Sequence, residues 1–161
     1  MTNLSSTIKT IQNIMRKDSG VDGDAQRIGQ LSWMLFLKIF SDSEENWSFY
    51  EEGYESPIPA ELQWSAWASD DEGITGDELL DFVNNKLFPT LKNLPTEGNK
   101  RAYMIRSIFE DAFNYMKSGQ ILFITAKCGH SVDLCHTFIN RYLPKNYGTL
   151  AKNKRQSEQE I

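Results

Sequence analysis

The sequence has few of the residues on which most site chemistry depends. Two cysteines and two histidines among 161 residues cannot form the disulfide framework of a small secreted domain. None of the ten glycines falls in a G-x-G or Walker-type loop, so no phosphate-binding signature is present. The longest nearly apolar run, Leu31–Phe40, is about half as long as a membrane-spanning helix. With no secretory pattern at the N-terminus, these absences predict a cytoplasmic protein without a membrane segment.

Basic side chains are missing from the middle of the chain. Residues 41–81 hold thirteen acidic side chains and no Lys or Arg, whereas the whole chain has a net charge of −5. The segments 1–40, 82–126 and 127–161 are therefore each mildly basic. A uniformly acidic protein would be repelled by DNA, but this uneven distribution leaves contact with nucleic acid open.

Helical periodicity of the apolar residues predicts an all-α fold, a small helical bundle. Helices are expected over residues 5–17, 24–41, 76–88 and 100–117, with Asp24 as an N-cap, a Thr75–Glu78 capping box, Pro89 as a helix stop and Gly119 at a C′ position. The helix over residues 24–41 is apolar nearly all round, which places it in the middle of the bundle.

The acidic segment 43–75 has no sustained period and carries three of the four tryptophans. It is predicted to be a long irregular loop with ordered pieces around Leu62–Ala68. Its aromatic side chains either pack on the core of the same chain or form a docking surface, because Trp and Tyr are favoured at interfaces. Trp64 and Trp67 are the candidates for partner docking.

The C-terminal part holds the only cluster of soft metal ligands. Cys128, His130, Cys135 and His136 are spaced C-x-H-x4-C-H, which suits zinc by ligand type but matches no known finger or knuckle. The acidic turn over residues 18–24 likewise lacks the spacing of a calcium loop. Without an oxyanion site or an orienting third group, a Cys–His nucleophile is also disfavoured. The sequence therefore predicts no catalytic residue, no metal site and no bound cofactor.

Four blocks resemble, in order and spacing, the beginning of the DNA methyltransferase subunits of type I restriction-modification systems. The first block joins a D-x-x-R lead-in to FLK-x-x-SD, and the second has a P…W-x-x-W element. The blocks are DAQRIGQLSWMLFLKIFSD (Asp24–Asp42), PAELQWSAWA (Pro59–Ala68), GDELLDFVNNKLFPTLKNL (Gly76–Leu94) and IRSIFEDAFNYMKSGQIL (Ile105–Leu122).

The resemblance implies a helical N-terminal domain that precedes a catalytic domain. In that family, the catalytic domain binds S-adenosylmethionine and methylates adenine N6 in DNA, using a Gly-rich loop and an Asn-Pro-Pro-aromatic motif that holds the flipped base. Neither motif occurs in this sequence, so the chain alone is predicted to be inactive. The implied partners are the specificity and restriction subunits of a type I complex, with DNA in the assembled complex.

After Leu122 the sequence departs from the family pattern. We expect a domain over residues 1–122 and a divergent tail over 123–161. A β-prone run at Ile121–Thr125, which could form either helix or strand, spans this boundary, and a weak helix and a frayed end follow it. A truncated or frame-shifted gene, or a stand-alone fragment, would explain this departure.

Three functions follow from these observations. The first is a docking and DNA-clamping domain of a modification subunit. The second is a free-standing regulator that binds modification or specificity subunits, or DNA, and competes with assembly of the complex. The third is an unrelated small enzyme that uses Cys128 or Cys135. For DNA contact the candidates are Lys100, Arg101 and Arg106, because they open the predicted helix over residues 100–117, where backbone N–H groups also favour phosphate.

Overall fold

The computed structural model describes residues 4–69 and 73–130 of the chain. Within these residues, helices are joined by turns and loops without any strand, which confirms the predicted all-α fold. In chain order the elements are α1 (Leu4–Met15), α2 (Asp24–Tyr50), the 3-10 turn η1 (Ala60–Leu62), α3 (Trp64–Trp67), α4 (Gly76–Asp81), the π-helical η2 (Phe82–Leu87), α5 (Phe88–Lys92), α6 (Lys100–Glu110) and α7 (Gly119–His130). None of the described helices is long and apolar enough to cross a membrane.

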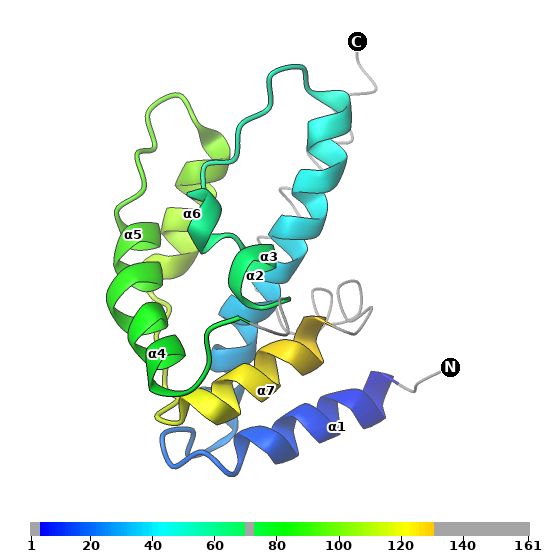
Figure 1. Cartoon of the computed structure of the whole chain (residues 1–161), viewed down its shortest axis with the longest axis vertical. Helices are drawn as coiled ribbons and strands as arrows, with labels where there is room; N and C mark the ends of the chain where they lie inside the picture. The colour runs from blue at the N-terminus through cyan, green and yellow to red at the C-terminus, as the bar shows by residue number, and fades with distance from the viewer. Residues whose placement is uncertain (1–3, 70–72, 131–161) are drawn as a thin grey trace.

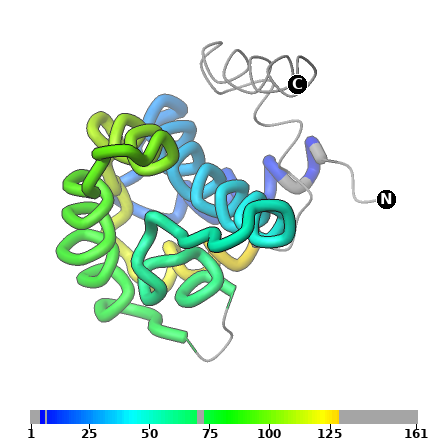
Figure 2. Tube along the Cα trace, turned by 90° about the horizontal axis from the view of Figure 1, so that it is seen from above, coloured from blue at the N-terminus to red at the C-terminus, as the bar shows by residue number. Residues whose placement is uncertain are grey.

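Helix α2 is the long central helix of the bundle. Helices α1 and α7 lie side by side across one end of α2 (Figure 1). Viewed from above, the other helices and the segment that follows α2 surround a common core (Figure 2). Between Gln30 and Phe40, side chains on every face of α2 are buried, as the apolar sequence predicts. They are Gln30, Leu31, Trp33, Met34, Leu35, Phe36, Leu37 and Phe40.

Aromatic rings fill the centre of this core around Trp33. The ring centroid of Trp33 lies 5.0 Å from that of Phe88 and 6.4 Å from that of Phe109, both in edge-to-face arrangements. Trp67 stacks on its other side at 6.5 Å. Rings from α2, α3, α5 and α6 therefore meet at one point, and offset or edge-on contacts of this kind add to the stability gained from burial alone.

The predicted end of α2 at Ser41 is wrong, because the helix continues to Tyr50. Apolar contacts support the added turns: the rings of Phe40 and Trp47 are 5.3 Å apart. An ion pair of 2.5 Å between the largely buried side chain of Lys38 and the more exposed Asp42 joins adjacent turns of the helix. Asp24 is the first residue of the helix rather than its cap, and Gly23 takes the N-cap position.

Pro89 does not stop the helix that begins at Gly76. Elements α4, η2 and α5 follow one another without a break from Gly76 to Lys92. The wider π turn ends at Leu87, just before Phe88 and Pro89. The missing N–H and bulky ring of Pro89 would disrupt regular α-helical bonding. Thr75 is the N-cap of α4 as predicted, although its side chain makes no capping hydrogen bond.

The helix predicted over residues 100–117 ends at Glu110, and residues 112–118 form an irregular connector. Gly119 starts α7 instead of capping α6. It must be glycine, since a Cβ atom there would lie 1.6 Å from the carbonyl oxygen of Gly76. This close backbone contact packs the start of α7 against the start of α4.

The run Ile121–Thr125 is helical and belongs to α7. Leu122 and Ala126 of this helix are buried, so the core extends past residue 122. The weak helix expected after residue 131 and the frayed end lie outside the described residues, and the domain boundary at residue 122 stays a prediction.

Candidate functional site

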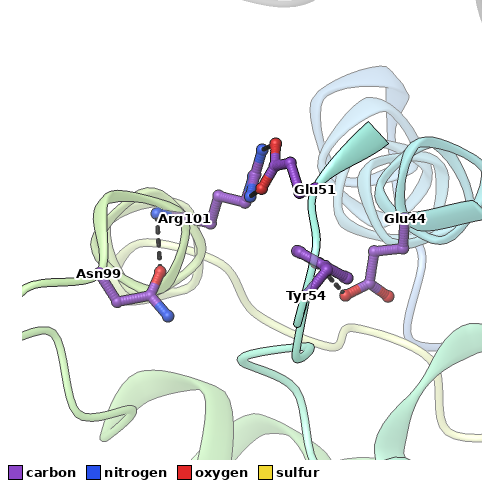
Figure 3. Close-up of polar contacts among 5 residues, drawn as sticks. All are labelled: Glu44, Glu51, Tyr54, Asn99 and Arg101. Carbon is purple, nitrogen blue, oxygen red and sulfur yellow. Dashed lines mark hydrogen bonds and ion pairs between the residues drawn. The ribbon is translucent and has the colours of Figure 1, made fainter. Parts of the chain in front are cut away.

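A polar cluster joins the end of α2 to the start of α6 (Figure 3). The guanidinium of Arg101 donates two hydrogen bonds to the carboxylate of Glu51, at 2.6 and 2.8 Å. Just beyond Glu51, the hydroxyl of Tyr54 donates to Glu44 at 2.8 Å. Parallel bonds from a planar guanidinium to a carboxylate fix both distance and orientation. The cluster thus holds the last turn of α2 at a defined position beside α6.

Aromatic rings cover the same guanidinium. Its central carbon lies 3.9 Å from the ring centroid of Trp47 and 5.3 Å from that of Tyr54, which are cation–π distances. The hydrogen bonds to Glu51 raise the pKa of Arg101 above its usual value. Burial, followed by the hydrogen bond to Glu44, raises the pKa of Tyr54 above its usual range. Both groups therefore keep one protonation state, and the cluster is structural rather than an acid–base couple.

The three DNA-contact candidates do not form one free edge. Arg101 is half-buried and bound to Glu51, so its charge is already neutralised within the chain. The side chain of Asn99 also accepts hydrogen bonds from the amides of Arg101 and Ala102. These are backbone N–H groups at the start of the helix that we expected to be available to phosphate. Lys100 and Arg106 remain exposed on α6.

Trp64 and Trp67 are not available for partner docking, because each has 2% of its surface exposed. Their rings meet edge-to-face with centroids 5.1 Å apart, and the indole N–H of Trp67 donates to the carbonyl of Leu62. Both tryptophans instead pack on the core of the same chain, which is the other arrangement that the sequence allowed for this segment. The predicted ordered pieces around Leu62–Ala68 are present as η1 and α3.

Two buried polar residues that the sequence did not single out hold the connector in place. Asp18, 3% exposed, accepts hydrogen bonds from the backbone N–H groups of Lys117 and Ser118 at 2.9–3.1 Å. Gln30, fully buried, donates to the side chain of Asn114 and accepts from the amide of Tyr115. The only sequence signal was a polar residue, Gln30, on an otherwise apolar stretch.

An open groove of about 370 Å³ lies between α5 and the connector. Lys92 is the one ionisable side chain among the described residues that line it, beside amides and aromatic rings. The amide of Asn114 is already bonded to Gln30 and Asn84. Such a lining lacks the paired acid and base that proton-transfer chemistry needs.

The metal and thiol alternatives gain no support from the described residues. They contain no group of three His, Cys, Asp or Glu side chains placed to hold an ion. Burial raises the pKa of the Cys128 thiol, which disfavours the thiolate that metal binding or nucleophilic attack would require. Cys135 and His136 lie outside the described residues.

Comparison with known proteins identifies the family. Residues 4–123 match the family model described as the HsdM N-terminal domain. Over 121 residues the chain is 57% identical to the type I restriction enzyme EcoEI methylase subunit of Escherichia coli. This alignment covers 74% of the chain and 25% of that subunit, so the chain matches about a quarter of its relative's length.

Solved structures agree with this match. A modification subunit of a putative type I restriction enzyme from Vibrio vulnificus YJ016 superposes with a TM-score of 0.76 and 28% identity, covering 96% of this chain and 35% of that one. A chain from a structure of the type I R-M system, titled for its complex assembly and conformational transition, gives 0.70 and 29%, covering 81% and 26%. The chain belongs to the family of HsdM N-terminal domains, the helical domains of type I modification subunits.

Proposed function

We propose that this domain is a non-catalytic module of a type I modification subunit, which docks partner subunits and helps to close the complex on DNA. The observation that carries the proposal is the 57% identity to a methylase subunit over 121 residues. The similarity to a structure titled for complex assembly and conformational transition supports a role in assembly. The partners would be the specificity and restriction subunits.

The chemistry would reside elsewhere in the full-length subunit. A complete modification subunit would methylate adenine N6 using S-adenosylmethionine, but none of the five prolines here follows an asparagine and no Gly-rich cofactor loop occurs. We expect no binding of S-adenosylmethionine to this chain in a calorimetric titration. Micromolar binding would contradict the proposed division of labour between domains.

DNA contact would come from the exposed residues of α6. Lys100 and Arg106 are exposed and can contact phosphates. The acidic end of α2 would repel phosphates. Two phosphate contacts contribute a salt slope of only about −1.8, so this domain would add a modest share to the affinity of the assembled complex. In gel shifts of that complex, Lys100→Ala with Arg106→Ala should weaken binding and flatten its salt dependence, while Lys9→Ala on α1 should do neither.

The docking role can be tested by mixing the chain with the specificity subunit, and separately with the restriction subunit, of its own type I system. Sedimentation velocity should reveal a complex with at least one of them. Sedimentation of every mixture as separate components would refute the docking role.

A further inference from the structure

Two neighbouring aromatic side chains stand in water at the end of α2. Phe49 is 86% exposed and Tyr50 is 87% exposed, the highest values among the large hydrophobic side chains that the structure describes. Single exposed apolar residues are common on protein surfaces. Two large exposed rings at consecutive positions form an aromatic patch at the end of α2, and exposed apolar patches mark interaction sites more often than isolated residues do.

The patch is held rigidly. It lies on the last turn of α2, between Trp47, which packs on Phe40 from the same helix, and Glu51, which binds Arg101. The contacts of Trp47 with Phe40 and of Glu51 with Arg101 (Figure 3) therefore anchor the chain before and after the two aromatic residues. A surface that is already ordered loses less conformational entropy when a partner binds.

Exposed acidic side chains flank the patch. Asp42, Glu45 and Phe49 recur at helical spacing along one exposed face of α2, and Glu52 is exposed just after the rings. Asp42 is paired with Lys38. Residues 41–81 contain no Lys or Arg and Arg101 is already bound to Glu51, so Glu45 and Glu52 are the exposed acids that set the charge beside the rings. Phosphate groups would be repelled here, whereas a cationic protein segment would be attracted.

We propose that Phe49, Tyr50, Glu45 and Glu52 form a docking surface for a basic segment, carrying Arg or Lys, of a partner subunit. The inference rests on the proposed docking function and names the surface and the chemistry of its occupant. Aromatic faces beside carboxylates suit a guanidinium, as the contacts of Arg101 with Trp47 and Glu51 illustrate within the chain itself. This acidic, aromatic surface on α2 replaces the buried Trp64 and Trp67 as the protein-facing site.

The test is a calorimetric titration of the chain with the specificity subunit and, separately, with the restriction subunit of its system. The double variant Phe49→Ser/Tyr50→Ser should weaken binding at least about tenfold, as for loss of an aromatic hot spot. Tyr103→Ser, which removes another exposed aromatic ring, this one on α6, is the matched control and should change affinity less than about twofold. Glu45→Gln/Glu52→Gln should weaken binding and reduce its salt dependence.

The outcomes separate this surface from the broader proposal. If the wild-type chain binds neither subunit, the docking function and the surface fail together. If it binds one and the Phe49→Ser/Tyr50→Ser variant binds equally well, only the surface is wrong. Loss of DNA binding or of self-association in that variant, with subunit binding intact, would identify DNA or a second copy as the occupant and overturn the proposal. The altered side chains are exposed, so thermal melts should confirm that each variant folds.

Discussion

At the scale of single residues, buried polar side chains fix the path of the irregular connector between α6 and α7. Asp18 receives N–H groups from residues about one hundred positions away in sequence, and it also accepts from Gly20 within its own turn. These bonds fix the start of α7 against the end of α1. A carboxylate accepting several amides satisfies backbone groups that the irregular connector would otherwise leave unpaired.

Asp18→Ala should therefore lower the free energy of unfolding by about 2–4 kcal/mol, because buried amides lose a charged acceptor. Asp22→Ala, an exposed acid in the same turn, is the control and should change stability by less than about 0.5 kcal/mol. Urea unfolding of the three proteins measures both effects. Equal stability of the two variants would mean that the hydrogen bonds accepted by Asp18 do not stabilise the fold.

Arg101 contributes through its stacking on Trp47 and its paired bonds to Glu51. We expect Arg101→Ala to lower the free energy of unfolding by about 1–2 kcal/mol, since the pair is partly solvated. Arg101→Lys keeps the positive charge but cannot make the two parallel hydrogen bonds to Glu51, so this variant should be less stable than the wild type and more stable than Arg101→Ala. The control is Arg106→Ala, an exposed arginine of the same helix. Chemical denaturation that ranks Arg106→Ala as the more damaging change would contradict the role given to Arg101.

Tyr54 gives the cluster a pH signature. Its folded-state pKa is raised above the ordinary 10.0 by burial and by Glu44. The neutral hydroxyl therefore adds stability that is fully present below about pH 10, where the unfolded chain begins to ionise, and is lost as pH rises further. Stability measured from pH 9 upward should fall more steeply in the wild type than in Tyr54→Phe. Parallel slopes would show that Tyr54 is not protected from ionisation.

At the scale of elements, two glycines in helices have opposite roles. A Cβ atom at Gly119 would collide with the backbone of Gly76, whereas one at Gly29 would meet a Tyr115 ring carbon at an ordinary 3.6 Å. Gly119→Ala should destabilise by about 1–3 kcal/mol or more through overpacking of α7 on α4. Gly29→Ala should instead stabilise by up to about 1 kcal/mol through helix propensity. A thermal melt in which both variants shift the same way would refute this difference.

The elements also show how far the sequence could lead. Apolar periodicity predicts the class of fold, the buried first half of α2 and most helix starts, because these depend on nearby residues. The end of α6 could not be predicted in this way, since Gln30 draws in Asn114 from 84 positions away. The helix end predicted at Pro89 was wrong for a similar reason, because it depends on tertiary contacts. Packing of Phe88 on Trp33 favours a continuous helix with a π turn over a helix break.

Candidate site residues were harder to predict than the fold because exposure depends on tertiary packing. The aromatic content of residues 43–75 was evident, but which rings would face water was not. Trp67 packs inward on Trp33 and Phe82, and Trp64 is buried against Trp67. Phe49 and Tyr50, by contrast, are exposed on a part of α2 that the acidic sequence did not predict to be helical. Arg101 likewise had a partner in Glu51, fifty positions earlier in the chain.

At the scale of the whole molecule, the domain offers two surfaces of different character. The end of α2 is acidic and aromatic, and α6 exposes the basic residues Lys100 and Arg106. A core of interlocking rings holds these helices in one bundle. Under the proposed function, the end of α2 would meet a protein partner, and Lys100 and Arg106 would meet DNA phosphates.

The central claim is that residues 4–123 act as the N-terminal domain of a type I modification subunit, and a domain exchange tests it most directly. In this experiment they replace the matching segment of the EcoEI methylase subunit, to which they are 57% identical, and methylation of DNA is measured after mixing with the specificity subunit of that system. We expect the chimera to assemble and methylate its target, whereas the subunit without this segment should do neither. A chimera that folds and binds S-adenosylmethionine but neither assembles nor methylates would show that residues 4–123 do not act as this domain.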